Sequence, residues 1–189
     1  MNVVKTIIDG VVIIEPRIFE DERGYFYESF SQREFEEKVC NTVFVQDNQS
    51  KSTYGVVRGL HFQKPPYAQS KLVRCVSGKV LDVVVDIRRN SPTFGRYISV
   101  ELSGENHRQL FIPRGFAHGY AVLSDEAVFQ YKCDNFYNKE SEGAIAWDDP
   151  EINVDWLIPA DKVILSVKDM QNRTLAESVT PFDYNEKLY

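Results

Sequence analysis

Short apolar runs separated by turn residues are the feature that most limits how this chain can fold. Gly, Pro, Asn and Asp interrupt these runs every 8–12 residues, a spacing typical of β-sandwiches and barrels. Strands are expected at residues 3–8, 11–15, 25–30, 43–49, 56–62, 71–76, 79–87, 97–102, 108–112, 118–123 and 127–133. Because they follow one another as a continuous meander without intervening helices, an antiparallel double sheet is the simplest closure.

One helix has clear start signals, at residues 31–39. Ser31 can cap its first turn, Glu34 completes a capping box, and Phe30 with Phe35 fits a hydrophobic staple. Strand signals fade after Tyr137, so the remaining chain is expected to form a small C-terminal lobe that covers the sheets.

Length and charge exclude several kinds of partner. A chain of 189 residues is enough for one domain, predicted over residues 1–189. Its 22 basic and 28 acidic residues give a net charge of −6 with no basic run, which argues against binding to nucleic acid or to an anionic membrane. The N-terminus lacks the continuous apolar run of a signal peptide, and three widely spaced cysteines indicate no disulfide framework. We expect a cytoplasmic protein.

The segment from Gly55 to Gly78 contains the first candidates for chemistry. Arg58, His61 and Lys71 lie on segments that otherwise read as buried strand. Removing such groups from water costs several kcal/mol, so they are seldom found there without a partner or a task. A single histidine in a strand is more often a satisfied core residue, but the two nearby cations favour a functional interpretation of His61.

A short motif around the second strand histidine resembles the cupin superfamily. The pattern Pro113-x-Gly115-x-x-His118 matches the second cupin signature, and residues 55–78 occupy the place of the first. Metal-binding cupins have His-x-His and a Glu there, whereas this chain has His61-Phe62-Gln63 and no Glu before Gly78. One imidazole cannot hold a zinc or iron ion in the usual three-ligand geometry, so no metal is expected.

Without a metal to bind, His61 is free to act as a base. An imidazole is mostly neutral at physiological pH, and it can remove a carbon-bound proton when the resulting anion is stabilised. Lys71 could stabilise an enolate oxygen, and Tyr131 could return a proton from another direction. The chain therefore contains the groups needed for a metal-free enolisation.

Longer motifs resemble the dTDP-4-dehydrorhamnose 3,5-epimerase family, whose members are metal-free cupins. The resemblance runs from Glu15-Pro16-Arg17 to Lys168-Asp169. It is carried by Phe19 with Asp21-Glu22-Arg23-Gly24, Phe26-Tyr27-Glu28-Ser29-Phe30, Val45-Gln46-Asp47-Asn48, Arg58-Gly59-Leu60-His61, Lys71-Leu72-Val73-Arg74 and Phe111-Ile112-Pro113-Arg114-Gly115-Phe116-Ala117-His118-Gly119. It implies an all-β, cupin-type antiparallel jelly-roll sandwich, a homodimer, and a dTDP-4-keto-6-deoxy sugar as substrate. No cofactor is expected, because the ketone of that substrate acidifies both neighbouring carbons.

The same resemblance implies a role for each matching residue. His61 matches the base, Asp169 the carboxylate that holds its imidazole, Tyr131 the acid and Lys71 the cation beside the enolate oxygen. Residues that match sugar-binding or diphosphate-binding positions are Arg23, Glu28, Gln46, Asn48, Arg58 and His118. Phe19 and Tyr137 match aromatic positions near the thymine, one of them reaching across from the partner subunit.

Apart from the resemblance, several of these residues have ordinary structural readings. Asp169 would be a surface carboxylate, Tyr131 a core residue, Arg23 a turn residue and Phe19 a packing residue. Simple alternation also puts Arg58 and His61 on opposite faces of one strand, so a bulge at the intervening glycine, Gly59, is predicted.

The chain departs from the family pattern at Val167, where a Glu is expected beside Lys168 and Asp169. This departure bears on how the carboxylate is fixed.

Other functions remain open at the level of sequence. The same scaffold could epimerise a single centre or act as a 3,4-ketoisomerase on a related dTDP-4-keto sugar. A metal-dependent cupin dioxygenase or isomerase is a second alternative. A non-catalytic cupin that binds sugar nucleotides is a third.

Overall fold

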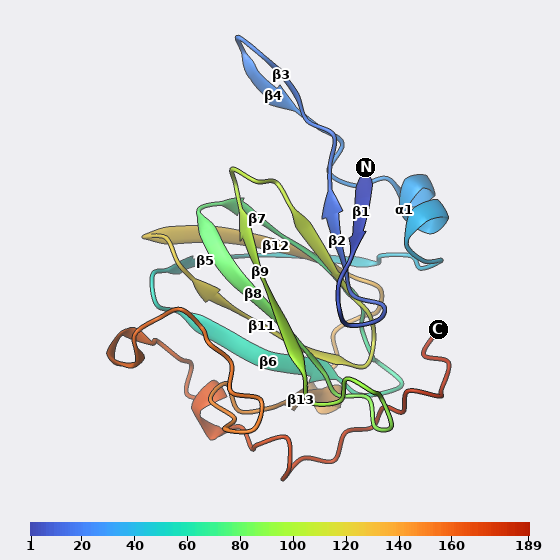
Figure 1. The fold of residues 1–189 in the computed structure, drawn as a ribbon, viewed down its shortest axis with the longest axis vertical. Helices are drawn as coiled ribbons and strands as arrows, with labels where there is room; N and C mark the ends of the chain where they lie inside the picture. Colours follow the sequence, from blue (N-terminus) through green and yellow to red (C-terminus); the bar gives the residue numbers. More distant parts are fainter.

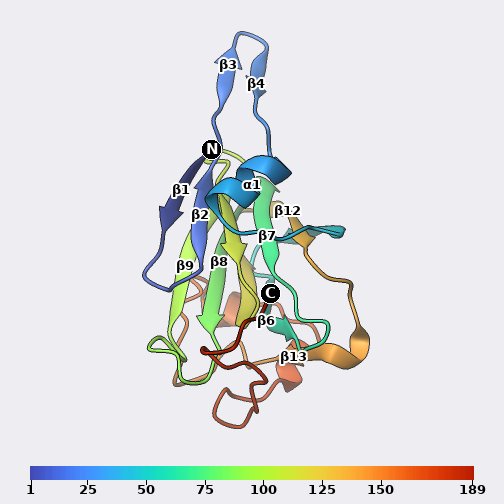
Figure 2. The ribbon, with the colours of Figure 1, turned by 90° about the vertical axis from the view of Figure 1, so that its right-hand side faces the viewer.

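The computed structural model describes residues 1–189 and consists of two antiparallel sheets packed against each other (Figures 1 and 2). The six-stranded sheet has the order β1 (Asn2–Lys5), β2 (Val12–Glu15), β10 (Gln109–Ile112), β7 (Lys71–Ser77), β12 (Glu126–Cys133) and β5 (Gln46–Thr53). The five-stranded sheet has the order β13 (Glu142–Ala144), β6 (Val57–Gln63), β11 (Phe116–Val122), β8 (Lys79–Asp86) and β9 (Tyr97–Ser103). The predicted all-β jelly-roll sandwich is confirmed.

Three smaller features complete the fold. Strands β3 (Phe19–Asp21) and β4 (Gly24–Phe26) form a separate hairpin, which projects from one end of the sandwich in both views (Figures 1 and 2). Helix α1 (Gln32–Lys38) follows it, and short 3-10 helices lie at η1 (Lys139–Ser141), η2 (Ala160–Lys162) and η3 (Asp169–Gln171). No helix has both the length and the apolar character needed to cross a bilayer.

The expectation of one continuous meander was wrong. Within the two large sheets only β1 with β2 and β8 with β9 are neighbours both in sequence and in space, while β10 lies between β2 and β7, and β11 between β6 and β8. Apolar periodicity reports which face of a strand is buried, and it carries no information about which strand lies beside it. The chain passes repeatedly between the two sheets, so side chains from both sheets pack in the core between them.

The five-stranded sheet is buried on both of its faces. On β8, Leu81, Val83 and Val85 pack against Trp156 and other residues of the C-terminal lobe. Val80 and Val84, on the opposite face, contact the six-stranded sheet. The predicted covering lobe is therefore present, and it closes the outer face of this sheet (Figure 1).

Helix α1 begins where the sequence predicts. The Ser31 hydroxyl accepts from the Glu34 N–H at 3.4 Å, and the Phe30 and Phe35 rings lie 5.9 Å apart. The Glu34 carboxylate does not reach back to complete the capping box, because it accepts from the amino group of Met1 at 3.1 Å instead. Phe35 anchors the helix on a small apolar cluster with Ile14, Leu72 and Phe111.

Some strand limits differ from the expected ones. The strand expected at 43–49 runs over Gln46–Thr53, because its residues are mostly polar and their ladder with β12 is invisible to apolar periodicity. The strand expected at 25–30 ends at Phe26. Strand β13 was not predicted, because its three residues carry little apolar signal and form the edge of the sheet beside β6.

Candidate active site

A cavity of about 130 Å³ opens between the two sheets at the end where β6 meets β13. Strands β5, β7 and β12 of one sheet line it, facing β6 and β13 of the other. Six of the residues singled out in the sequence are among its lining residues: Gln46, Asn48, His61, Lys71, Tyr131 and Tyr137. The fold thus gathers groups that are up to 91 positions apart in sequence.

His61 is held by a carboxylate from the C-terminal lobe. Its Nε2 lies 2.5 Å from Oδ1 of Asp169, which begins η3, 108 positions later in the chain. The Asp169 side chain is 4% exposed, whereas that of His61 is 38% exposed toward the cavity. Burial opposes ionisation of Asp169, but its hydrogen bonds with His61 and Ser166 outweigh burial and keep its pKa below the ordinary value. An ionised Asp169 can therefore orient His61 and stabilise its protonated form.

The predicted bulge at Gly59 is present, but it does not bring Arg58 into the cavity with His61. Across the β6–β11 ladder, His61 pairs with His118 and Arg58 pairs with Tyr120, so β6 contains one extra residue. Gly59 supplies it with a φ of +140°, and a Cβ there would lie 2.6 Å from Cα of Gly119. Two backbones approach closely at this point, and only glycine fits.

Lys71 is half-buried and has no ion-pair partner. It begins β7, and its Nζ lies 5.8 Å from the centre of the Tyr131 ring. Burial lowers the pKa of Lys71, although the nearby Asp82 charge acts in the opposite direction. Such a cation is available to an anionic group of a ligand.

Tyr131 approaches the cavity from the sheet opposite His61. It lies on β12, paired with Asn48 of β5 and Val73 of β7. Burial raises the pKa of its phenol, so the hydroxyl stays protonated at neutral pH and can donate. The strand alternation that predicts a core position for Tyr131 is real, since its ring also packs against the apolar core between the sheets, which includes Val73 and Phe129.

Amide side chains form a hydrogen-bonded row along the polar side of the cavity. The N–H of Tyr137 donates to Oε1 of Gln46 at 3.0 Å, and Nε2 of Gln46 donates to Oδ1 of Asn48 at 3.1 Å. Asn48 in turn donates to Sγ of Cys133 at 3.7 Å. Burial raises the pKa of the Cys133 thiol to about 11, so this thiol remains protonated. The row offers polar contacts to a ligand and fixes the backbone of Tyr137.

His118 lies beside His61 but is fully enclosed. Its ring Nε2 contacts Oδ2 of Asp82 at 2.9 Å, and neither residue lines the cavity. Burial raises the pKa of Asp82 and lowers the pKa of His118. The structure therefore places this predicted ligand-binding residue in a second His–Asp pair behind the first.

Arg58 reaches from β6 across to the other sheet. Its Nε and Nη2 donate to Oγ of Ser52 at 3.3 and 3.2 Å. It does not line the cavity with His61 but lies near enough for its charge to act on Tyr131.

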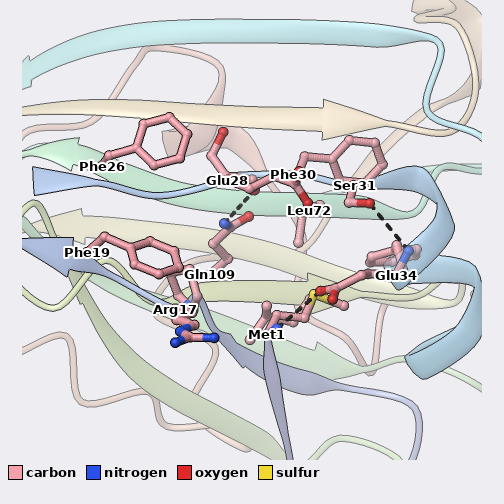
Figure 3. Close-up of a pocket in the computed structure, with 14 residues that line it drawn as sticks. Met1, Arg17, Phe19, Phe26, Glu28, Phe30, Ser31, Glu34, Leu72 and Gln109 are labelled. Atoms are coloured by element: carbon pink, nitrogen blue, oxygen red, sulfur yellow. Dashed lines mark hydrogen bonds and ion pairs between the residues drawn. The ribbon is translucent and has the colours of Figure 1, made fainter.

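Phe19, Arg23 and Glu28 are not brought to this cavity within one chain. Phe19 and Glu28 line a separate cavity of about 290 Å³ together with Phe26 and Arg17 (Figure 3). Arg23, at the tip of the β3–β4 hairpin, pairs only with Asp21 and leaves 85% of its side chain exposed. Figures 1 and 2 show this hairpin pointing away from the body of the chain.

Sequence reasoning missed several residues around the site. Glu142 and Lys168 both line the cavity and form an ion pair at 2.5 Å. Ser166 contacts Asp169, and Asp82 contacts His118. Asp82 could have been found, because a carboxylate inside the apolar strand β8 needs a partner. The others lie in loops and edges without periodicity, so nothing in their local sequence identifies them. No group of three or more His, Cys, Asp or Glu side chains is arranged to hold a metal ion.

Comparison with known proteins bears on this geometry. The family model described as dTDP-4-dehydrorhamnose 3,5-epimerase matches residues 5–177. A dTDP-4-dehydrorhamnose 3,5-epimerase from Shigella flexneri is 58% identical over 179 residues, which cover 94% of this chain and 98% of that protein. The crystal structure of a dTDP-4-dehydrorhamnose 3,5-epimerase from Elizabethkingia anophelis is 56% identical, with a TM-score of 0.89 over 92% of this chain and 96% of that one.

A third relative was solved with a sugar nucleotide bound. It is a dTDP-6-deoxy-D-glucose-3,5-epimerase from Legionella pneumophila in complex with dTDP-4-keto-L-rhamnose, and it is 48% identical to this chain. Its TM-score is 0.94 over 98% of this chain and 99% of that one.

Proposed function

The chain belongs to the dTDP-4-dehydrorhamnose 3,5-epimerase family, and from that membership we infer that the cavity around His61 is the active site of a sugar-nucleotide isomerase. It converts dTDP-4-dehydro-6-deoxy-D-glucose to dTDP-4-dehydro-β-L-rhamnose by inverting C3 and C5. Both carbons flank the C4 ketone, so the substrate itself acidifies the protons that must move. The product is an intermediate of dTDP-L-rhamnose biosynthesis.

The observation that carries the mechanism is the placement of a base and an acid on opposite sheets. His61 with Asp169 lies on the five-stranded side of the cavity, and Tyr131 lies on the six-stranded side. His61 removes the proton from a carbon beside the ketone, and the electron pair moves onto the C4 oxygen. Tyr131 then donates its hydroxyl proton to the other face of the same carbon, which inverts the centre. Proton exchange with solvent resets both residues.

Lys71 stabilises the enolate formed between these two steps. Its ammonium has no ion-pair partner in the chain, so an enolate oxygen in the cavity would provide one. No step of this scheme needs a metal or an added cofactor, because the ketone supplies the electron sink. Gln46, Asn48 and Tyr137 line the cavity and contact the substrate beside the reacting groups, whereas Arg58 and His118 lie outside the cavity lining.

These roles predict different defects for the base and the acid. In D₂O, His61→Asn abolishes both turnover and deuterium uptake, because no base removes a proton. Tyr131→Phe slows turnover but still allows deuterium uptake into the unreacted substrate, because His61 can return a proton to the face from which it came. The matched control is Tyr97→Phe. The Tyr97 hydroxyl, which this variant removes, accepts from the Asp155 N–H far from the cavity. Uptake lost equally in both active-site variants would contradict the separate roles.

The enzyme works as a homodimer, in which the β3–β4 hairpin of one subunit completes the cavity of the other. Phe19, Tyr25 and Phe26 leave 50%, 56% and 71% of their surfaces exposed on this hairpin, an arrangement that suits an interface with a second copy. Across such an interface Phe19, Arg23 and Glu28 would reach the sugar nucleotide of the partner subunit. We further place the enzyme in the cytoplasm, because a charged nucleotide sugar does not cross a membrane unaided.

Mixing two inactive variants tests the shared site. Arg23→Ala and His61→Asn each damage a different part of it, so a mixed dimer keeps one intact site if Arg23 acts on the partner's cavity. Random exchange of equal amounts would restore roughly a quarter of the wild-type sites. A mixture with no activity beyond that of its parents would contradict the shared site. A monomer in light scattering would exclude the dimer itself.

A further inference from the structure

Ser166 contacts the proposed machinery twice and has no part in the scheme above. Its hydroxyl donates to Oδ2 of Asp169 at 2.9 Å and accepts from the Asp169 N–H at 3.1 Å. The Met170 N–H also donates to the Ser166 carbonyl at 3.2 Å, so these residues form one hydrogen-bonded turn. One side chain thus holds both the backbone and the carboxylate of the same aspartate.

The two oxygens of Asp169 have separate partners. Oδ1 contacts His61 at 2.5 Å, while Oδ2 is occupied by the Ser166 hydroxyl. A carboxylate held at only one oxygen can rotate about its terminal side-chain torsion, which is broad for Asp. A second bond at the other oxygen restricts that rotation and keeps Oδ1 in line with the imidazole.

We propose that Ser166 is a positioning residue for epimerisation, which fixes Asp169 so that Asp169 can orient His61. The proposal rests on the proposed function, in which His61 is the base. It also accounts for Val167, where the family pattern has a Glu: Val167 is 69% exposed, and Asp169 is held without it. On the other side of the turn, Lys168 is anchored to Glu142.

A purely structural role for Ser166 predicts a different pattern of effects. Ser166 is exposed to solvent, so losing its hydroxyl leaves no buried cavity. The matched control is Ser178, whose hydroxyl donates locally to the Thr174 carbonyl at 2.8 Å in the same lobe and has no contact with Asp169. Ser178→Ala removes the same atoms without touching the His61–Asp169 pair.

The test compares Ser166→Ala, Ser166→Thr and Ser178→Ala with the wild-type chain by steady-state kinetics and thermal melting. Ser166→Ala should lower kcat by about tenfold with KM unchanged, the lower end of what losing a partner that orients a reactive group costs. Ser166→Thr retains the hydroxyl and should recover most of the wild-type kcat. Ser178→Ala should match the wild type, and all four proteins should melt at similar temperatures.

Three results would overturn the proposal while leaving the function intact. These are a Ser166→Ala kcat within twofold of an active wild type, a loss confined to KM, and a Thr variant as impaired as the Ala variant. A wild-type chain with no turnover would instead overturn the proposed function.

Discussion

Replacing Asp169 by Asn tests the role of the buried carboxylate beside the base. Asn preserves the size of the side chain and can still accept a hydrogen bond from His61, but it carries no charge. In the proposed mechanism His61 becomes an imidazolium when it removes the substrate proton, and the wild-type carboxylate 2.5 Å away would stabilise that charge. Binding of the substrate before this proton transfer depends much less on the charge of Asp169. The substitution should therefore act on kcat and leave KM nearly unchanged.

The size of the effect follows from the single charged hydrogen bond that is lost. A bond of this kind contributes about 1.5–3 kcal/mol net. At about 1.4 kcal/mol for each factor of ten, kcat should fall roughly 10- to 150-fold. Initial rates measured at saturating and at limiting substrate separate kcat from KM.

The matched control for this substitution is Asp161→Asn. Asp161 is an exposed carboxylate of the same lobe, with only Lys162 near it at 3.7 Å. It should behave as wild type, and circular dichroism should show that both variants are folded. A kcat of Asp169→Asn within threefold of wild type, or a loss expressed only in KM, would refute the role given to this carboxylate.

Three further predictions concern the fold and the pH dependence. Gly59→Ala places a Cβ 2.6 Å from Cα of Gly119, at a positive φ. It should therefore lower the free energy of unfolding by about 3 kcal/mol and the melting temperature by roughly 6–12 °C, and turnover should fall as well. An unchanged melting curve would contradict this. Burial lowers the pKa of Lys71, so deprotonation of its ammonium should set the basic limb of the pH profile of kcat/KM. Lys71→Arg should move that limb to higher pH, because a guanidinium stays protonated. A limb that stays in place would assign it to another group. Asp86→Asn leaves Arg88 without its buried partner and should cost about 3 kcal/mol in urea unfolding at pH 7. Burial disfavours ionised Asp86, but its hydrogen bonds outweigh burial and hold its pKa below the ordinary value. Its contribution to the free energy of unfolding is therefore complete above about pH 4 and is lost as the pH falls through the folded-state pKa. A cost of Asp86→Asn that did not shrink in acid would contradict this assignment.

Apolar periodicity predicted much of the sandwich but not its connectivity. Strands β6 to β12 lie close to their expected positions because each alternates or continues in apolar residues. Strand β5 is displaced from its expected position because its hydrogen-bonding partner, rather than an apolar face, makes it a strand. Strand order depends on contacts distant in sequence, which no local pattern encodes.

The site could be predicted only in part for a similar reason. His61 and Lys71 were identifiable because charged or titratable groups in buried strands are costly. Asp169 could be connected to His61 only through the family resemblance, because its local sequence is that of a polar surface segment. Ser166 and the Glu142–Lys168 pair were invisible, since their importance comes entirely from where the C-terminal lobe folds back.

The central claim is that one base acts at both carbons beside the ketone. The most direct measurement is conversion of dTDP-4-dehydro-6-deoxy-D-glucose in D₂O by the wild-type chain, with the product followed by proton NMR. The mechanism predicts dTDP-4-dehydro-β-L-rhamnose with deuterium at both C3 and C5, and no label at either carbon with His61→Asn. Label at a single carbon, or a product formed without deuterium, would contradict it.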